Sequence, residues 1–185
     1  MQLRIISGEF KGRVIKSPNS KFTRPTTDRV RETLFNILNN KIDFDGIQVL
    51  DLYSGSGALG LECLSRGAAH VTFIEKNRPV YLNLLGNVDL LKVKEFVDII
   101  PTTSVFYTRK NLNKKYDLIL ADPPFFEYDI YEVVQNVFKN ELLNEDGIMV
   151  IERSIQTREK DIENIGIEPQ KKIGDALLYI FDNLL

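Results

Sequence analysis

The chain has 185 residues, of which 43% are hydrophobic and 27% charged, and its net charge is −2, which describes one ordinary globular domain with a full core. Its apolar runs are strand-sized, far short of the roughly 20 residues that a membrane span needs, and the first residues lack the apolar segment of a secretion signal. One cysteine, Cys63, and one histidine, His70, exclude an internal disulfide and a Cys/His zinc site, so we expect a cytoplasmic protein without a metal.

The beginning of the chain is basic, whereas the rest is acidic. Residues 1–31 hold eight basic and two acidic residues, and the remainder holds 16 basic and 24 acidic ones. Two short apolar runs, 3–6 and 13–15, are punctuated by Gly8 and Gly12, which predicts a folded β-hairpin. A basic hairpin on an acidic body indicates that a polyanion approaches from one side, although a merely solvated tail would have the same composition.

A capped helix with a basic first turn is predicted next. Thr27 or Asp28 can cap it, and five apolar residues share one of its faces: Val30, Leu34, Phe35, Ile37 and Leu38. Arginines at its start are unusual because cations oppose the helix dipole there. Such a helix end suits a phosphate or carboxylate, but a plain structural role explains it equally well.

From residue 47 onward, strand-like runs alternate with helical ones. The predicted strands are 47–52, 71–75, 96–101, 116–121 and 147–152, and the predicted helices are 58–66, 77–91, 103–110, 128–140 and 157–164. This order predicts an α/β fold with a parallel sheet covered by helices on both faces. Two further strand-like stretches, 167–173 and 176–181, with Gly174-Asp175 as the turn between them, would add antiparallel strands at one end.

A glycine-rich turn, Asp51 to Gly60, leads from the first of these strands into the next helix. Glycines let a backbone approach a ligand closely, and ligands of open α/β sheets bind beyond the carboxyl ends of the strands. Asp51 at the strand end suits the cationic amino-acid part of S-adenosylmethionine, and Glu75 at the end of the next strand suits ribose hydroxyls. The same glycine spacing followed by an acid also fits nicotinamide dinucleotides, so the turn alone leaves both cofactors open.

The motif Asp122-Pro123-Pro124-Phe125 follows the predicted strand 116–121. Its two prolines remove backbone donors and stiffen the loop. The acceptors that remain, the Asp122 carboxylate and the Pro123 carbonyl, can hold one planar amino group and aim its nitrogen at a methyl donor. Phe125 offers a face on which an extruded base can stack. Together with the glycine turn, this motif favours methyl transfer to an amine over nicotinamide chemistry.

These motifs, in this order, resemble those of the RsmD-like small-subunit ribosomal RNA guanine-N2 methyltransferases. The segment 24–32, which reads Arg-Pro-Thr-Thr-Asp-Arg-Val-Arg-Glu, is the family-specific part of the resemblance. The other matching stretches are residues 4–8, 11–13, 51–57, 62–68, 122–125 and 174–175. The resemblance therefore spans nearly the whole chain.

The resemblance implies a Rossmann-like seven-stranded methyltransferase sheet, with residues 1–24 as a basic hairpin extension and 25–185 as the S-adenosylmethionine-dependent domain. It implies an enzyme that methylates the exocyclic N2 amino group of a guanine in small-subunit ribosomal RNA, either naked or in an assembling ribosomal particle. The expected cofactor contacts are Asp51, Tyr53, Ser54, Gly55, Gly57, Glu75, Thr103 and Asp122. The expected catalytic residues are Asp122, Pro123 and Phe125, and the expected RNA contacts are Arg4, Lys11, Arg13, Arg24, Arg29 and Arg31.

Several alternatives stay open from the sequence. The amine motif would serve adenine N6 in DNA or RNA, or a protein amide, equally well. A catalytically idle RNA-binding assembly factor would keep the same fold, and a nicotinamide oxidoreductase lacks only an obvious hydride-site acid or base. Tyr53 and Tyr128 either line the cofactor pocket or merely cover it. After the third strand, where many methyltransferases bind adenine with an acid or amide, a hydroxyl of Thr103 or Ser104 would have to substitute.

Overall fold

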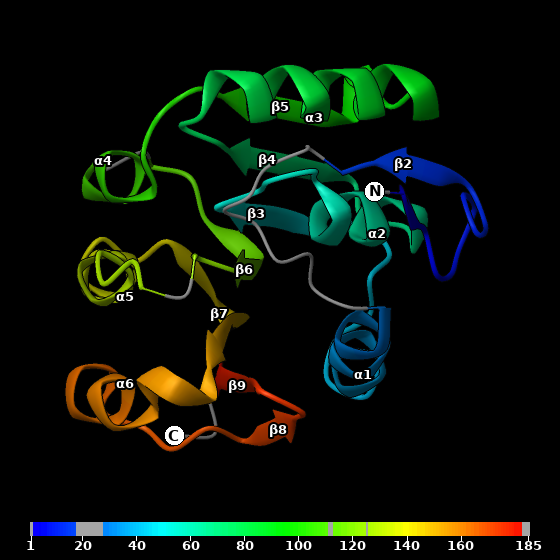
Figure 1. Ribbon diagram of the computed structural model, residues 1–185. Coiled ribbons are helices and arrows are strands. Elements are labelled where there is room, and N and C mark those ends of the chain that lie inside the picture. The colour runs from blue at the N-terminus through cyan, green and yellow to red at the C-terminus, as the bar shows by residue number, and fades with distance from the viewer. Residues whose placement is uncertain (1, 18–27, 111–112, 125, 183–185) are drawn as a thin grey trace.

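The computed structural model describes residues 2–17, 28–110, 113–124 and 126–182. In this part of the chain a seven-stranded sheet is flanked by helices, and a two-stranded hairpin lies beside it (Figure 1). The hairpin consists of β1 (Gln2–Arg4) and β2 (Val14–Lys16). The strands of the large sheet are β3 (Gln48–Leu52), β4 (His70–Ile74), β5 (Val97–Ile100), β6 (Tyr116–Ala121), β7 (Leu143–Ser154), β8 (Lys171–Ile173) and β9 (Ala176–Phe181).

The sheet has the strand order β5-β4-β3-β6-β7-β9-β8. Its first five strands are parallel, and β9 and β8 are joined to them in antiparallel fashion. The chain returns to the middle of the sheet when β6 pairs with β3, so β3 lies at the topological switch point, with β4 on one side and β6 on the other. Ligands of open α/β sheets bind at this position.

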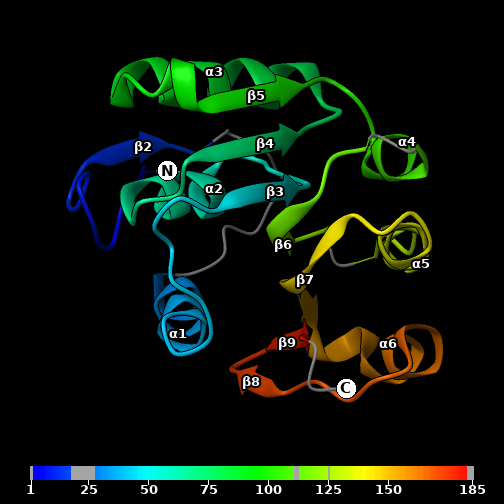
Figure 2. The same ribbon diagram turned by 180° about the vertical axis from the view of Figure 1, so that it is seen from behind.

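The described residues form six α-helices, which cover the two faces of the sheet (Figures 1 and 2). They are α1 (Asp28–Leu38), α2 (Ala58–Ser65), α3 (Arg78–Leu91), α4 (Ser104–Arg109), α5 (Ile130–Lys139) and α6 (Arg158–Ile165). One hydrophobic core joins α1, α2 and α3 to one face of the sheet, and a second core joins α4, α5 and α6 to the other. Neighbouring residues of a strand alternate between the two cores, as Val49 and Leu50 do, because successive side chains point to opposite faces.

The predicted α/β fold, parallel sheet and N-terminal hairpin are confirmed, with three larger shifts of element bounds. The strand predicted at 147–152 begins at Leu143, because Tyr116 already pairs with that residue. The helix predicted from 128 begins at Ile130, since the preceding residues form a turn. The stretch predicted at 167–173 is a strand only over its last three residues. Just before them, the Gln170 side chain accepts a hydrogen bond from Ile180 N at 2.6 Å.

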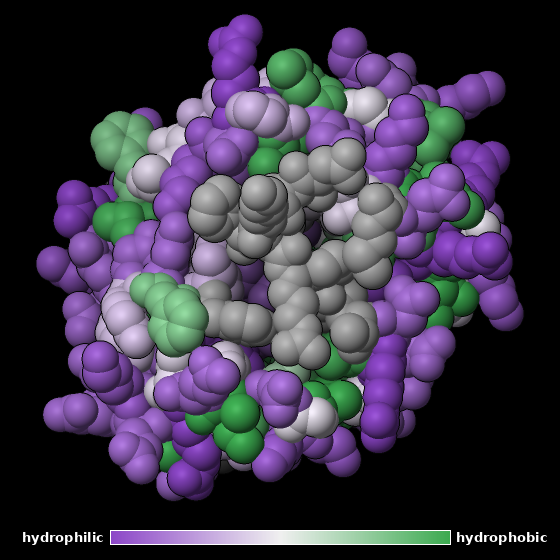
Figure 3. Space-filling model, viewed as in Figure 1, coloured by the Kyte–Doolittle hydropathy of each residue, from purple (hydrophilic) through white to green (hydrophobic). Residues whose placement is uncertain are grey.

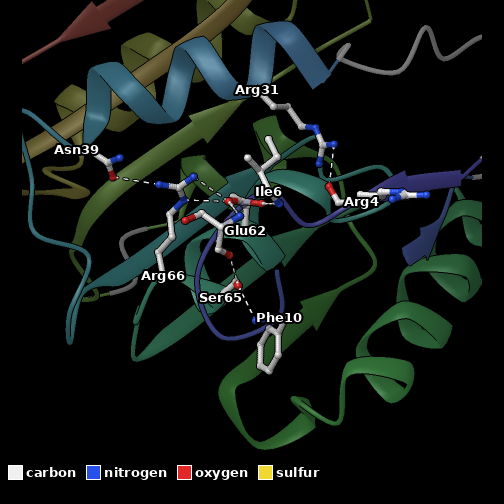
Figure 4. A network of polar contacts seen from close by, with 9 residues as sticks. Arg4, Ile6, Phe10, Arg31, Asn39, Glu62, Ser65 and Arg66 are labelled. Atoms are coloured by element: carbon white, nitrogen blue, oxygen red, sulfur yellow. Dashed lines mark hydrogen bonds and ion pairs between the residues drawn. The ribbon is translucent and has the colours of Figure 1, made fainter. Parts of the chain in front are cut away.

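The hairpin is fixed to the body through α2 (Figure 4). The buried Glu62 carboxylate accepts hydrogen bonds from the backbone N–H groups of Ile6 and Ser7, at 2.7 and 3.0 Å. Arg66 compensates the charge, with its Nε 2.9 Å from Glu62, and its guanidinium lies 4.6 Å from the ring centroid of Phe35 in α1. Leu3, Ile5 and Ile15 of the hairpin belong to the same core as α1 and α2. The predicted boundary at residue 24 lies outside the described residues.

The surface seen in Figure 3 is mostly hydrophilic, with hydrophobic side chains scattered between the charged ones. In the part of the chain that the structure describes, no helix combines the length and the apolar character needed to cross a membrane.

Candidate functional site

Three loops leave the sheet side by side at its carboxyl edge. Leu52, the last residue of β3, pairs with Ile74 at the end of β4 and with Ala121 at the end of β6. The glycine turn, Glu75 and Asp122 therefore emerge at one level, although they are far apart in the sequence, and together they form what we call the rim. The parallel register thus brings together the cofactor and amine motifs predicted separately from the sequence.

Asp51 organises the glycine turn from inside. Its side chain is almost fully buried, and its Oδ2 accepts a hydrogen bond from Gly60 N at 2.9 Å, in the first turn of α2. Burial raises the pKa of Asp51 to about 8, against the lowering effect of the Gly60 hydrogen bond, and the negative charges of Asp122 and Glu75 raise it further. The Asp51 carboxyl group, which is predicted to contact the cofactor directly, therefore already has a hydrogen-bond partner within the chain.

A pH prediction follows from this raised pKa. The cationic amino-acid part of S-adenosylmethionine favours the Asp51 carboxylate, so binding below pH 8 is expected to release a proton, and affinity should rise with pH until about 8. Calorimetry in two buffers of different ionisation enthalpy measures this release. The cofactor's own amino group titrates near the same pH, at about 8. The difference between the wild type and Asp51→Asn isolates Asp51, and identical proton release in the two proteins would contradict the prediction.

The raised pKa of Asp51 also predicts that the stability of the cofactor-free protein changes with pH, in the direction opposite to that of the cofactor affinity. Between the ordinary aspartate pKa of 3.8, which holds in the unfolded chain, and about 8, the folded state keeps a proton on Asp51 that the unfolded state has lost. The free energy of unfolding is therefore expected to fall as the pH rises through this window, and to become independent of Asp51 above it. Asp51→Asn should flatten this part of the profile, as denaturant titrations at several pH values would measure.

The turn between β3 and α2 is held by its own side chains and backbone. The Ser54 hydroxyl donates a hydrogen bond to Asp51 O at 2.6 Å. The same hydroxyl accepts a hydrogen bond from Ile74 N at 2.9 Å. Ser54 therefore joins the ends of β3 and β4. Gly57 adopts a left-handed φ of 80°, and a Cβ there would lie 2.3 Å from the Leu84 side chain of α3. The left-handed φ therefore favours glycine at position 57, and the Leu84 side chain would have to shift to admit any other residue.

Glu75 is oriented by two backbone donors. Its carboxylate accepts hydrogen bonds from Gly55 N at 3.0 Å and from Asn77 N at 2.7 Å. Burial raises the pKa of Glu75, although these two hydrogen bonds and the neighbouring Lys76 lower it. Each carboxylate oxygen has two acceptor sites, so an oriented Glu75 can still accept hydrogen bonds from ribose hydroxyls.

The amine motif lies on the β6 side of the turn. Asp122 is partly buried and close enough to Asp51 to raise its pKa, and Pro123 is buried. Phe125, the predicted stacking residue, lies outside the described residues. Asp122 therefore lies close to Asp51, and the roles of Asp122 and Pro123 in holding an amino group stay predictions.

Tyr53 and Thr103 both have partners within the chain. Tyr53 has a left-handed φ of 60°, and its hydroxyl donates to Asp129 Oδ1 at 2.9 Å, just before α5. Burial and the Asp129 charge raise the pKa of Tyr53, which stays a neutral donor. The Thr103 hydroxyl caps α4 by accepting a hydrogen bond from Phe106 N at 3.1 Å. The side chain of Thr103 is exposed, and its adenine contact stays a prediction.

The loop after Pro124 is braced by contacts that the sequence motifs did not reveal. Lys76 Nζ lies 2.8 and 2.9 Å from the two carboxylate oxygens of Glu127, and so links the ends of β4 and β6 across the glycine turn. The fully buried Arg153 donates to Glu127 O at 3.3 Å and pairs with Asp161 at 3.1 Å. The two contacts of Glu127 join residues 51 and 26 positions apart, so no local pattern announces them.

Asn87 is a second residue that the motifs did not reveal. It is buried on α3, accepts a hydrogen bond from Lys16 N, and donates to Lys16 O and Ser56 O, each at 2.9 Å. The end of the hairpin is thereby tied to the glycine turn. A polar residue on the same face as Leu84 and Val88 was the signal that could have identified it.

The predicted RNA contacts divide into two groups. Arg4, Lys11, Arg13 and Arg29 are exposed, and Arg24 lies outside the described residues. Arg31 departs from the expectation because its side chain is fully buried, with Nη2 2.5 Å from Asp28 Oδ1 and 2.9 Å from Arg4 O (Figure 4). In this structure Arg31 ties α1 to the hairpin and does not face a polyanion in solvent.

The hairpin turn and the rim lie at opposite ends of the molecule. In both ribbon views the turn between β1 and β2 points away from the carboxyl ends of β3 and β4 (Figures 1 and 2). Lys11, in this turn, and a substrate amine at Asp122 are therefore separated by the depth of the sheet and α2. An RNA that reached both would have to extend along the molecule.

Comparisons with known proteins agree with this geometry. The family model described as "Conserved hypothetical protein 95" matches residues 3–182. Ribosomal RNA small subunit methyltransferase D of Escherichia coli is 38% identical over 155 residues, which cover 84% of this chain and 76% of that protein. A solved putative methyltransferase from Escherichia coli superposes with a TM-score of 0.83 at 31% identity, covering 98% of each chain.

A more distant structure shares the fold. The Thermus thermophilus 16S ribosomal RNA N2 G1207 methyltransferase, solved with S-adenosylmethionine and guanosine, superposes with a TM-score of 0.74 at 20% identity. The match covers 98% of this chain and 49% of that one.

Proposed function

The chain belongs to the family described as "Conserved hypothetical protein 95", together with ribosomal RNA small subunit methyltransferase D, and we propose that it methylates the N2 amino group of a guanine in small-subunit ribosomal RNA with S-adenosylmethionine. The observation that carries this proposal is the common rim of the glycine turn, Glu75 and Asp122. This common rim supports the proposal because an acceptor for an amino group would there lie beside a site for the methyl donor.

The residues of the rim fit S-adenosylmethionine. A Cβ at Gly55 would meet only Tyr53 O, at 3.9 Å, so the backbone of the turn is open to a ligand there. Glu75 is oriented toward this turn, and its carboxylate suits ribose hydroxyls. Asp51 and Asp122 provide negative charge for the cationic part of the cofactor. The Asp51 carboxylate would attract this cation from beneath the glycine turn. The Asp122 carboxylate would attract it from the side on which the substrate amine binds.

The chemistry that follows needs few protein groups. When bound, S-adenosylmethionine supplies an electrophilic methyl group on a positively charged sulfur. A guanine amino group is a weak nucleophile because its lone pair is delocalised into the ring, so its orientation matters most. Asp122 and the Pro123 carbonyl accept the two amino hydrogens and direct the nitrogen toward the methyl group. Asp122 would also accept the proton that the amino nitrogen loses when it is methylated.

The substrate is proposed to be an assembling small ribosomal particle. The hairpin turn, which carries the exposed Lys11, lies at the opposite end of the molecule from the rim, so an RNA target has to extend along the molecule to reach both (Figures 1 and 2). A folded RNA domain held by ribosomal proteins can span both. This arrangement also accounts for a strongly basic N-terminal region on an otherwise acidic chain.

The test uses cells from which this protein has been deleted. Their small-subunit RNA is expected to lack one N2-methylguanosine by nucleoside mass spectrometry, and the purified protein should restore it with S-adenosylmethionine. Particles and naked RNA are offered separately, to identify the substrate. Unchanged N2-methylguanosine with a loss of N6-methyladenosine would move the proposal to another amine. Absence of any cofactor binding in calorimetry would indicate an idle RNA-binding factor.

Two neighbouring arginines are expected to behave differently. Arg29 is exposed, and Arg29→Ala should reduce the slope of log Kd against log salt by roughly 0.7 to 0.9, the loss of one phosphate contact. Arg31 is buried, and Arg31→Ala should instead lower the free energy of unfolding by about 2 kcal/mol, because hydrogen bonds to Asp28 and Arg4 O are lost. RNA titrations at several salt concentrations and urea unfolding measure the two effects. A reduced salt slope in folded Arg31→Ala would contradict the assignment.

A further inference from the structure

Two aromatic side chains stand exposed on the loop that follows the amine motif. Phe126 is 66% exposed, the largest fraction among the exposed large hydrophobic side chains of the described residues, and Tyr128 is 38% exposed. In the same direction of view as Figure 1, Figure 3 shows hydrophobic atoms exposed near the start of α5. Orientation of the amine by Asp122 and Pro123 uses neither ring. Exposed aromatic surface that chemistry does not require is typical of an interaction site.

The loop that carries these rings is held rigidly. Glu127 lies between them, and its N–H donates to Pro124 O at 2.9 Å, while its carbonyl accepts from Arg153 at 3.3 Å. Its carboxylate is bound by Lys76. The Asp129 carboxylate accepts the Tyr53 hydroxyl at 2.9 Å. The rings are therefore presented by a braced backbone, so little conformational entropy remains to be lost when a partner binds.

A positively charged lysine side chain lies beside one of these two exposed rings. Lys160 of α6 has its Nζ 4.8 Å from the ring centroid of Tyr128, and the rings of Tyr131 and Tyr128 have their centroids 5.9 Å apart. The two nearest acids of the loop, Glu127 and Asp129, are occupied by Lys76 and Tyr53. Aromatic faces beside a lysine are the usual means of binding single-stranded nucleic acid, because bases stack on the rings and a cation attracts the phosphate.

We propose that Phe126, Tyr128 and Lys160 form a stacking platform for the nucleotide next to the target guanine, an inference that rests on the proposed function. An extruded guanine at Asp122 leaves its neighbour in the strand without a stacking partner. The platform lies a few residues along the chain from Asp122, on the side of β6 that faces α5 and α6. It binds that neighbouring base irrespective of its identity and so holds the strand open around the target.

The test compares alanine variants in steady-state methylation of small-subunit particles from cells lacking the protein. Phe126→Ala and Tyr128→Ala are each expected to raise KM for the particle about tenfold and to change kcat by less than about twofold, the result of losing one stacked base. Tyr128→Phe keeps the ring and should stay close to the wild type. Lys160→Gln should raise KM more at low salt than at high salt. Calorimetry should show unchanged affinity for S-adenosylmethionine in all variants.

The matched control is Phe96→Ala. Phe96 is 50% exposed but lies just before the edge strand β5, at the amino end of the parallel strands and so away from the rim, and its loss should leave KM unchanged. A wild-type KM in the Phe126 and Tyr128 alanine variants would overturn the platform. So would a loss in Tyr128→Phe equal to that in Tyr128→Ala. If sedimentation shows a dimer that Phe126→Ala dissociates without an effect on KM, the surface binds a second copy of this chain instead.

A binding experiment separates failure of the platform from failure of the proposed function. A fluorescein-labelled single-stranded RNA with one guanine among uridines is titrated with each variant, followed by anisotropy. If the wild type methylates no particle but binds this RNA more tightly than Phe126→Ala does, the function is wrong and the platform stands. If the wild type methylates particles and all variants bind and react alike, the platform is wrong and the function stands.

Discussion

Replacing Asp122 by alanine is expected to lower kcat about a thousandfold while the Kd for S-adenosylmethionine changes only severalfold. The carboxylate is the group that orients the amino nitrogen and accepts its proton, and both roles belong to the reaction rather than to cofactor binding. Asp122 also contributes negative charge near Asp51, which it repels. Its removal lets Asp51 ionise more readily, and this offsets part of the attraction lost for the cofactor.

Asp122→Asn separates the two roles of the carboxylate. The amide oxygen of asparagine still accepts one hydrogen bond but has no negative charge, so kcat should lie between those of the wild type and Asp122→Ala. Single-turnover methylation gives the chemical step, and calorimetry gives the cofactor affinity of each variant. A loss of cofactor affinity as large as the loss of turnover would show that this loop belongs to the cofactor site and not to the amine site.

Replacing Gly8 by alanine is expected to lower the free energy of unfolding by roughly 3 kcal/mol or more. Gly8 has a left-handed φ of 79°, and a Cβ there would lie 1.7 Å from the backbone oxygen of Ser65. No rotation of a side chain relieves an overlap with backbone, so the hairpin must move away from α2. The hydrogen bonds that Glu62 accepts from Ile6 N and Ser7 N would lengthen with it.

The hairpin contains its own control. Gly12 has nearly the same left-handed φ, 82°, but a Cβ there would meet no atom within 4 Å. Gly12→Ala should therefore cost only the backbone strain, about 1 kcal/mol. Thermal and urea unfolding compare the two variants, and hydrogen exchange at Ile6 and Ser7 reports whether the hairpin has moved. Equal destabilisation by the two substitutions would show that the contact with α2 is unimportant.

Much of the architecture was readable in the sequence because it depends on local patterns. The alternation of short β-type runs with helical ones predicted the parallel sheet, and the glycine turn and the amine motif were placed at strand ends. Pro123 and Pro124 have no backbone N–H to donate but keep their carbonyl acceptors, and this holds for any fold of the chain. These features follow from side-chain periodicity and backbone chemistry over a few residues.

Other features depended on contacts between distant parts of the chain. The basic start of α1 looked like a binding surface, yet Arg31 points inward, because Arg4 O and Asp28 offer it partners there. The place of Asp51 at a strand end was predicted, but its hydrogen bond with Gly60 N beneath the turn was not. The sequence of α1 alone does not show that Arg31 is buried, because the hairpin that covers it includes Arg4, which lies 27 residues earlier in the chain.

The sequence by itself determined the fold class, the reaction that Asp122 and its prolines can serve, and the family to which the chain belongs. Only the tertiary structure decided which of the marked residues face solvent, how Lys76 and Arg153 brace the loop with its exposed rings, and how far the basic hairpin turn lies from the rim. Motifs arise from neighbours along the chain, which the sequence displays. Exposure, charge pairing and rigidity arise from neighbours in space, which only the register of the sheet and the packing of its helices bring together.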